Sequence, residues 1–211
     1  KDSFQESDIL GITRPITKKN YLISKVEEIP FIFQEAYRIS TEGRPGPILI
    51  DVPKDIQLTK INAEDFESYF HQATLALEEK PDIKKSFSGL EAIAEAINRS
   101  EKPLIIAGAG IQKSHSELFL KELVEKAQIP VALSLLGLGN LPATHPLFLG
   151  MLGMHGTYEA NKAIQEADLI LALGIRFDDR ITGDPKQFAT QAKIIHIDID
   201  AKEINKNITA S

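Results

Sequence analysis

The chain has 211 residues, of which 43% are hydrophobic and 26% charged, and its formal net charge is −6. This composition predicts a soluble globular protein, either one large domain or one domain with a piece of another. The negative charge disfavours a nucleic-acid-binding protein, which needs an electropositive surface. The chain has no cysteine, which excludes disulfides, thiolate zinc sites and cysteine nucleophiles. No apolar run approaches the roughly twenty residues of a membrane span.

The first part of the chain predicts one helix and one strand. Residues 29–40 place Ile29, Phe33, Ala36 and Tyr37 on one helical face, with Pro30 in the first turn. The sequence GRPGP at 43–47 ends this helix, and ILIDV at 48–52 follows as a short apolar strand. Residues 54–85 show no clear period, and we expect a linker that includes a helical piece.

From about residue 88, helical and strand patterns alternate. The predicted helices open near 88 and cover 114–127, 158–166 and a final segment near Lys202, and the predicted strands cover 104–108, 131–135, 169–173 and 193–199. Alternation of this kind predicts an α/β fold in which a parallel sheet carries helices on both faces.

Glycines and charged residues follow two of these strands, at the edge where open α/β sheets bind ligands. The sequence Gly108-Ala109-Gly110 lies between a strand and a helix, where backbone can approach a diphosphate. Lys113 replaces the third glycine of a dinucleotide fingerprint, and no acidic residue follows at the expected distance, which disfavours an ordinary NAD site.

The second group follows the apolar strand 169–173 and contains Arg176, Asp178, Asp179 and Arg180. Arginines match phosphates and aspartates accept hydrogen bonds from hydroxyls, so this group predicts a ligand site, with a solvated charged loop as the alternative. Asp198 and Asp200 close a later strand, either as acceptors for ribose hydroxyls or as a cap and a turn. Of the histidines, only His155 lies among neighbours that indicate cofactor contact, and His196 is expected in the core. No pair has metal-ligand spacing, so no metal ligand is expected.

Seven motifs occur in an order that resembles the large catalytic subunit of acetolactate synthase (acetohydroxyacid synthase), a family of thiamine diphosphate-dependent enzymes. They are DSFQESDILGITRPITKKNY, GRPGPILIDVPKD, GAGI at 108–111, SLLGLG at 134–139, GMLGMHGT at 150–157, GIRFDDRITG at 174–183 and KIIHIDID at 193–200. Pyruvate oxidase and glyoxylate carboligase share the architecture, but FQE, RFDDR and GMHGT fit acetolactate synthase best. The first residue is not Met and the resemblance begins within a motif, so we expect a fragment.

The resemblance implies three regions: the C-terminal part of a pyrimidine-binding α/β domain at 1–57, a linker at 58–85, and a Rossmann-like central FAD-binding domain at 86–211, incomplete at its C-terminus. The parent enzyme would condense two pyruvates, or pyruvate with 2-ketobutyrate, losing CO2, in the first common step of branched-chain amino acid biosynthesis. It would use FAD, thiamine diphosphate and Mg²⁺. The chain lacks a GDG motif for the last two, so we expect it to be inactive alone.

The resemblance also implies partners and location: 2-keto acids as substrates, a homodimer or homotetramer, and room for a regulatory small subunit, in bacterial cytoplasm or a plastid stroma. The alternatives are a pyruvate oxidase-like enzyme with thiamine diphosphate and FAD, and a stand-alone nucleotide-binding regulatory module. The catalytic set that lines the substrate channel is Phe4, Gln5, Lys54, Met154, Asp179 and Arg180. The FAD-binding set is Arg44, Gly108, Ala109, Gly110, Ser134, Leu135, Leu136, Gly137, Leu152, Gly153, Met154, His155, Gly174, Ile175, Arg176, Asp178, Arg180, Ile181, Asp198, Ile199, Asp200 and Glu203.

Overall fold

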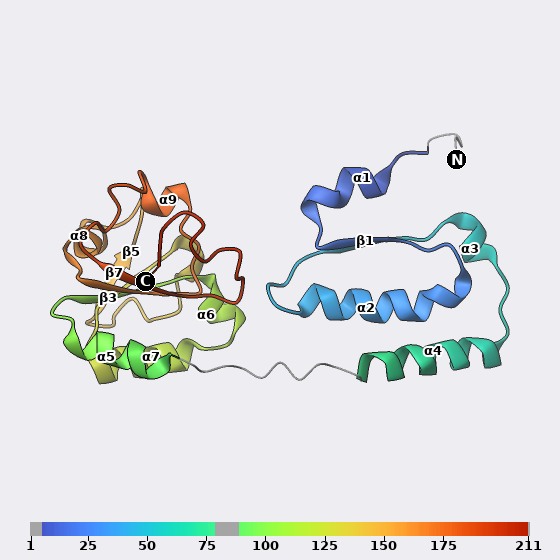
Figure 1. The fold of residues 1–211 in the computed structure, drawn as a ribbon, viewed down its shortest axis with the longest axis horizontal. Helices are drawn as coiled ribbons and strands as arrows, with labels where there is room; N and C mark the ends of the chain where they lie inside the picture. The colour runs from blue at the N-terminus through green and yellow to red at the C-terminus, as the bar shows by residue number, and fades with distance from the viewer. Residues whose placement is uncertain (1–5, 79–88, 211) are drawn as a thin grey trace. The chain divides into compact units, whose positions relative to one another are not determined.

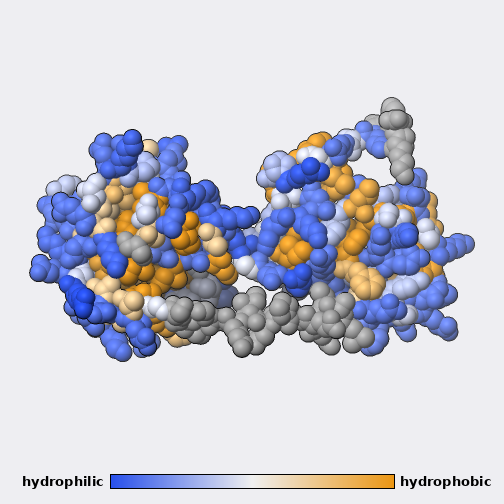
Figure 2. Space-filling view, in the orientation of Figure 1, coloured by the Kyte–Doolittle hydropathy of each residue, from blue (hydrophilic) through white to orange (hydrophobic). Residues whose placement is uncertain are grey.

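A computed structural model describes residues 6–78 and 89–210 of the chain. The chain divides into two compact units, Lys1–Lys85 (unit 1) and Ser86–Ser211 (unit 2) (Figure 1). Apolar side chains reach the surface of both units, orange among hydrophilic residues in Figure 2.

Unit 1 contains a two-stranded parallel sheet, β1 paired with β2, and two longer helices. Helix α2 has Pro30 in its first turn, as predicted, and the helical piece expected in the linker is the 16-residue α4. Gln34 of α2 donates through Nε2 to Thr74 Oγ1 of α4 at 3.1 Å, so α4 is part of unit 1's packing. The elements of unit 1 are α1 (Ile9–Thr13), η1 (Arg14–Ile16), β1 (Lys19–Leu22), η2 (Val26–Glu28), α2 (Ile29–Thr41), β2 (Ile48–Asp51), α3 (Lys54–Leu58) and α4 (Ala63–Glu78).

Unit 2 is built on a five-stranded sheet with the order β5-β4-β3-β6-β7, and every neighbouring pair is parallel. The prediction of a parallel α/β sheet is confirmed. The order reverses between β3 and β6, which is the point where doubly wound sheets bind ligands. Its elements are α5 (Leu90–Arg99), β3 (Pro103–Ala107), α6 (Ala109–Lys113), α7 (Glu117–Ala127), β4 (Val131–Leu133), η3 (Leu135–Gly137), β5 (Phe148–Met151), α8 (Tyr158–Glu166), β6 (Leu169–Leu173), α9 (Asp179–Thr182) and β7 (Lys193–Ile197).

Helices cover both faces of this sheet, with α8 on one side and α5 and α7 on the other (Figure 1). Alternate residues of the central strands face the two layers: Ile106 packs in the cluster that includes Ile164 of α8, whereas Ile105 packs in the cluster that includes Val124 of α7. A fully buried aliphatic side chain of this kind contributes about 1.5–3 kcal/mol. Because both faces are covered, the strands are continuous apolar runs rather than alternating ones.

Strand β1 of unit 1 was not predicted, and three local features of unit 2 also differ from the sequence predictions. Strand β5 was not predicted, because Gly150, at φ +104°, interrupts a short half-buried edge strand. The helix expected from residue 114 begins at Glu117, after the separate helix α6. The predicted helix near Lys202 is wrong: residues 201–205 form turns, Asn205 has φ +61°, and Asp200 Oδ1 accepts from the Lys202 amide at 3.1 Å. Side-chain acceptors of this type favour turns over helix.

Candidate functional site at the carboxyl edge of the unit 2 sheet

The residues predicted to bind FAD in unit 2 follow the carboxyl ends of all five strands. Since the strands are parallel, these ends lie at one edge of the sheet, although the residues span about a hundred positions of sequence. The loops after β3, β4, β5, β6 and β7 supply, respectively, residues 108–110, 134–137, 152–155, 174–181 and 198–203. The fold therefore brings this predicted set together at the carboxyl edge.

The glycines after β3 are packed against the glycine after β6. A Cβ on Gly108 would lie 2.4 Å from the Gly174 carbonyl oxygen, and one on Gly110 would lie 2.5 Å from the Gly174 Cα. The Gly108 amide donates to Leu173 O at 3.0 Å and the Gly110 amide to Gly174 O at 2.9 Å. This differs from the expectation that these glycines leave space and amides for a diphosphate, because the neighbouring strand end fills that space. Ala109, at the start of α6, is the remaining candidate donor of the three.

The loop after β4 presents apolar side chains outward. The Ser134 amide donates to Ala107 O at 3.0 Å, and a Cβ on Gly137 would lie 2.6 Å from the same oxygen, so the loop packs on the end of β3. Leu135 and Leu136 are then 68% and 70% exposed. With Met154 after β5 (60%) and Ile199 after β7 (72%), they give this edge an apolar surface. For an exposed apolar surface of this kind, contact with a flat apolar ring of a ligand is more favourable than contact with water.

The loop after β5 is joined to the loop after β6. Gly153 has φ +97°, and a Cβ there would lie 2.5 Å from Arg180 O. The Met154 amide donates to Arg180 O at 2.8 Å, and Arg180 Nη1 lies 3.6 Å from Met154 Sδ. Two residues predicted to line the substrate channel are thus neighbours, and both are exposed.

The segment after β6 alternates between core and surface. Arg176 is exposed, Phe177 is buried, Asp178 is half-buried, and Asp179 and Arg180 are exposed. Asp178 caps α9, its Oδ1 accepting from the amides of Arg180 at 3.1 Å and Ile181 at 3.3 Å. The segment therefore exposes two guanidinium groups, of Arg176 and Arg180, and the carboxylate of Asp179 to solvent. The neighbouring carboxylate of Asp178 is hydrogen-bonded to backbone amides. Arginine is well matched to phosphate or carboxylate ligands.

The loop after β7 holds the acidic residues predicted for the ribose. The Asp200 amide donates to Asp198 Oδ1 at 2.9 Å, so Asp198 supports a turn. Glu203 is half-buried, and its carboxylate accepts from Lys206 Nζ at 3.1 Å. Of the two roles expected from the sequence, turn formation is the one seen for Asp198 and Asp200.

The other predicted residues lie in different surroundings. Leu152 and Ile175 are buried, backbone and side chain alike, whereas His155 is exposed. Arg44 and Lys54 belong to unit 1 and are exposed there. Phe4 and Gln5 lie outside the described residues.

Side chains that were not predicted hold the backbone of these loops. Asn140 Nδ2 donates to Gly108 O at 2.8 Å, Asn161 Nδ2 donates to Gly153 O at 2.9 Å, and Asn207 Nδ2 donates to Phe177 O at 2.6 Å. His196, expected in the core, is half-buried, and its Nε2 forms a hydrogen bond with the Ile175 carbonyl oxygen at 2.9 Å. Its ring meets the edge of Phe177. No residue-type signal marks these side chains, because most of their partners are distant in sequence.

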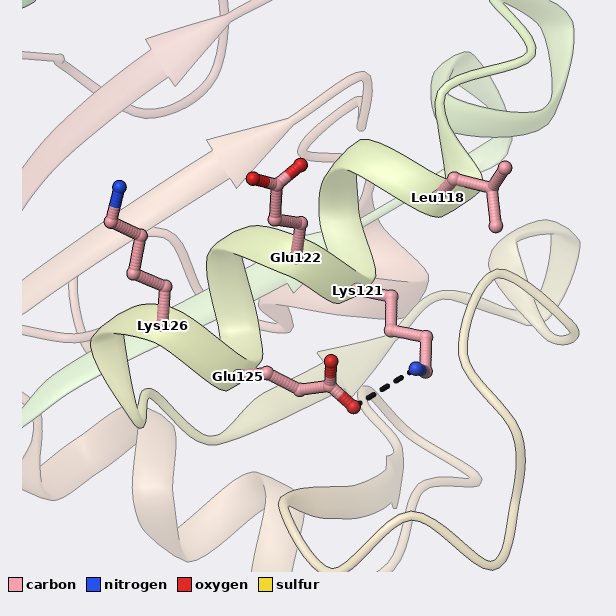
Figure 3. A pocket seen from close by; sticks show the side chains of 5 residues that line it. All are labelled: Leu118, Lys121, Glu122, Glu125 and Lys126. Atoms are coloured by element: carbon pink, nitrogen blue, oxygen red, sulfur yellow. Dashed lines mark ion pairs between the residues drawn. The ribbon is translucent and has the colours of Figure 1, made fainter.

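A hollow of about 490 Å³ lies elsewhere, on the outer surface of α7 (Figure 3). Its lining side chains come from this one helix, and Figure 3 shows the Lys121–Glu125 ion pair, at 3.0 Å, across it. A single solvated helix face offers no convergent groups for a ligand.

Within residues 6–78 and 89–210, no group of three or more His, Cys, Asp or Glu side chains is placed to hold a metal ion. In the same ranges, no helix has both the length and the apolarity needed to cross a bilayer.

Unit 2 is thus a doubly wound α/β domain with an apolar, arginine-bearing edge at the carboxyl ends of its strands. Residues 90–211 match the family model of the thiamine pyrophosphate enzyme central domain. Because the match covers more than half of the chain, the chain belongs to this enzyme family.

Curated relatives cover the whole chain. It is 46% identical over 210 residues to an acetolactate synthase large subunit of Buchnera aphidicola subsp. Schlechtendalia chinensis, matching 99% of this chain and 36% of the relative. It is 48% identical over 213 residues to a probable acetolactate synthase large subunit of Methanocaldococcus jannaschii (99% and 35%). It is also 48% identical over 209 residues to a chloroplastic acetolactate synthase of Arabidopsis thaliana (99% and 30%). The chain spans about a third of the length of these relatives.

Proposed function

We propose that the chain is part of the catalytic subunit of an acetolactate synthase, in which unit 2 binds FAD and lines part of the substrate channel. The observation that carries this proposal is the convergence of five loops on the carboxyl edge, where exposed Leu135, Leu136 and Met154 lie with the exposed arginines. The names of the curated relatives support the choice of enzyme. Residues 1–57, with Lys54, would belong to the pyrimidine-binding domain, and residues 58–85 to the linker.

The edge fits an extended dinucleotide. The exposed leucines after β4 would lie against the flavin ring, the start of α6 at Ala109 would face the diphosphate, and Arg176 would pair with a phosphate or a ring carbonyl. Asp200 would accept from a ribose hydroxyl. Joining two 2-keto acids involves no net oxidation, so FAD would serve the fold and the channel rather than electron transfer.

The substrates would be pyruvate, or pyruvate with 2-ketobutyrate, and within unit 2 their carboxylates would be attracted by Arg180. Thiamine diphosphate, held with Mg²⁺ by parts of the parent enzyme outside this chain, would supply the chemistry that removes carbon dioxide. The parent would be a homodimer or homotetramer, with a regulatory small subunit in some systems, and would act in bacterial cytoplasm or in a plastid. The relatives include chloroplastic enzymes and a bacterial large subunit, which is consistent with either location.

Flavin titration of the full-length parent enzyme tests the FAD site. Arg176→Ala should weaken FAD binding at least about tenfold, since a hydrogen bond from a charged donor contributes roughly 1.5–3 kcal/mol. The control is Arg99→Ala, which removes an exposed arginine from α5 at its ion pair with Glu95 and should leave FAD affinity unchanged. Equal affinity in wild type and Arg176→Ala would reject the assignment.

Turnover assays separate the alternatives. With thiamine diphosphate and Mg²⁺, the full-length parent should form acetolactate from pyruvate, and the 211-residue chain alone should form none. Oxygen consumption coupled to pyruvate would favour a pyruvate oxidase-like enzyme. Flavin binding by a parent without any turnover would favour a nucleotide-binding regulatory module.

A further inference from the structure

Asn161, on helix α8, forms two hydrogen bonds with a single glycine of the loop after β5. The Gly153 amide donates to Asn161 Oδ1 at 2.9 Å, and Asn161 Nδ2 donates to Gly153 O at 2.9 Å. An asparagine amide has one acceptor and one donor side, so it satisfies both backbone groups of one residue at once. Neither aspartate nor an aliphatic residue could do this.

The helix that carries Asn161 is firmly held. Thr157 caps its start by accepting from the Ala160 amide at 3.3 Å, and Ala160 and Ile164 are buried against the sheet. The backbone from which the Asn161 side chain extends is therefore held in place. Gly153 has φ +97°, a conformation that is open to glycine and strained for other residues.

The position of Gly153 determines the position of the two channel residues proposed above. Directly after it, the Met154 amide donates to Arg180 O at 2.8 Å, and the Met154 sulfur lies 3.6 Å from Arg180 Nη1. A Cβ on Gly153 would be 2.5 Å from Arg180 O, so the two loops touch at this glycine. We therefore expect a shift of Gly153 to displace both residues.

We infer that Asn161 is a positioning residue which, through Gly153, places Met154 and Arg180 for an anionic 2-keto acid. The inference rests on the proposed function. A related device holds two other loops of the edge, where Asn140 binds the Gly108 carbonyl and Asn207 binds the Phe177 carbonyl. Of these three asparagines, Asn161 alone engages both the amide and the carbonyl of its partner, and its partner adjoins the Met154–Arg180 contact.

Kinetics of the full-length parent test this role with Asn161→Asp. The aspartate keeps the acceptor for the Gly153 amide, loses the donor, and sets a negative oxygen against the Gly153 carbonyl. We expect KM for pyruvate to rise about tenfold, because misplacement of a binding group by a fraction of an ångström weakens substrate positioning. The stability control is Asp168→Asn, at the opposite edge of the same sheet, which should lower Tm without moving KM. Asn161→Asp with lowered Tm and unchanged KM would show a structural role alone and overturn the inference.

Two further measurements keep the outcome decisive. In a double-mutant cycle, Met154→Ala should remove the part of the effect of Asn161→Asp on KM that acts through the Met154 side chain, whereas additive effects would contradict a route through that side chain. Methyl NMR of ¹³C-methyl methionine should show the Met154 signal, assigned with Met154→Leu, shifted in Asn161→Asp and unshifted in Asp168→Asn. This signal reports positioning even if the parent forms no acetolactate, so failure of the proposed function and failure of this inference are distinguishable.

Discussion

The two edges of the unit 2 sheet differ in how their polar groups are used. At the amino edge, before β3 and β6, the Asp168 carboxylate accepts from Ser100 Oγ and from the amides of Glu101 at 2.7 Å and Lys102 at 3.0 Å. The backbone there is also paired, with the Lys193 amide donating to Asp168 O at 2.8 Å. The polar groups named at this edge are therefore hydrogen-bonded to one another.

The carboxyl edge is more open. It presents exposed leucines after β4 and an exposed methionine after β5. Among the described residues, Asn140 Oδ1 and His196 Nδ1, both beneath this edge, are buried side-chain atoms without a partner. Unpaired buried polar atoms and exposed apolar side chains both cost stability, so the carboxyl edge is less favourable for stability than the amino edge. The amino edge holds the strands together, and under the proposed function the carboxyl edge carries the ligand site.

Gly174→Ala should cause the largest loss of stability among the substitutions at these two edges. Gly174 has φ +55°, and a Cβ would lie 2.6 Å from the Gly110 Cα, which is backbone that cannot rotate away. We expect the free energy of unfolding to fall by about 3 kcal/mol or more, measured by denaturant unfolding. Gly89→Ala is the control, because Gly89 is also left-handed, with φ +99°, but has no atom within 4 Å of its Cβ, and it should cost only about 1 kcal/mol. Equal losses would show that close packing between the strand ends is not the cause.

Asp168→Asn should have an intermediate effect that depends on pH. Burial raises the pKa of the Asp168 carboxyl, but hydrogen bonds from Ser100 and the amides of Glu101 and Lys102 outweigh it and leave the pKa below its usual value. The stabilisation is therefore present above the unfolded-state pKa and is lost as pH falls through the lower folded-state pKa. We expect wild type to exceed the variant by roughly 1–2 kcal/mol at pH 7 and the difference to shrink below about pH 4. A difference independent of pH would contradict this account, and reduced FAD affinity would break the separation of the two edges.

Lys121→Ala should have the smallest effect. Its ion pair with Glu125 joins two half-exposed side chains at 3.0 Å on the outer face of α7, and exposed pairs of this kind contribute little. We expect Tm and FAD affinity to stay within the error of thermal-unfolding and flavin-titration measurements. A clear loss of FAD affinity would indicate that the hollow of Figure 3, and not the carboxyl edge, serves the ligand.

Much of unit 2 could be predicted from the sequence because its elements carry local signals. Strand β6 is a continuous apolar run, as expected of a strand buried on both faces, and α8 begins and ends at the predicted residues because Thr157 caps it and its apolar face has helical spacing. Alternating patterns also predicted the parallel sheet, and with it the edge where the loops meet. The edge strand β5 escaped prediction because its pairing with β4, not its own half-buried sequence, makes it a strand.

How the residues of this edge are used depends on contacts between distant loops. The sequence shows that glycines follow β3 and β6, but not that they pack on each other, since Gly110 and Gly174 meet only through the sheet register. The asparagines are equally visible in the sequence, yet Asn140 and Asn207 bind carbonyls 32 and 30 residues away. The helical and strand periods of a sequence predict which face of its own element a residue occupies, because they reflect backbone geometry over a few neighbouring positions. Hydrogen bonds between distant loops follow from the order of strands in space, which no local period encodes.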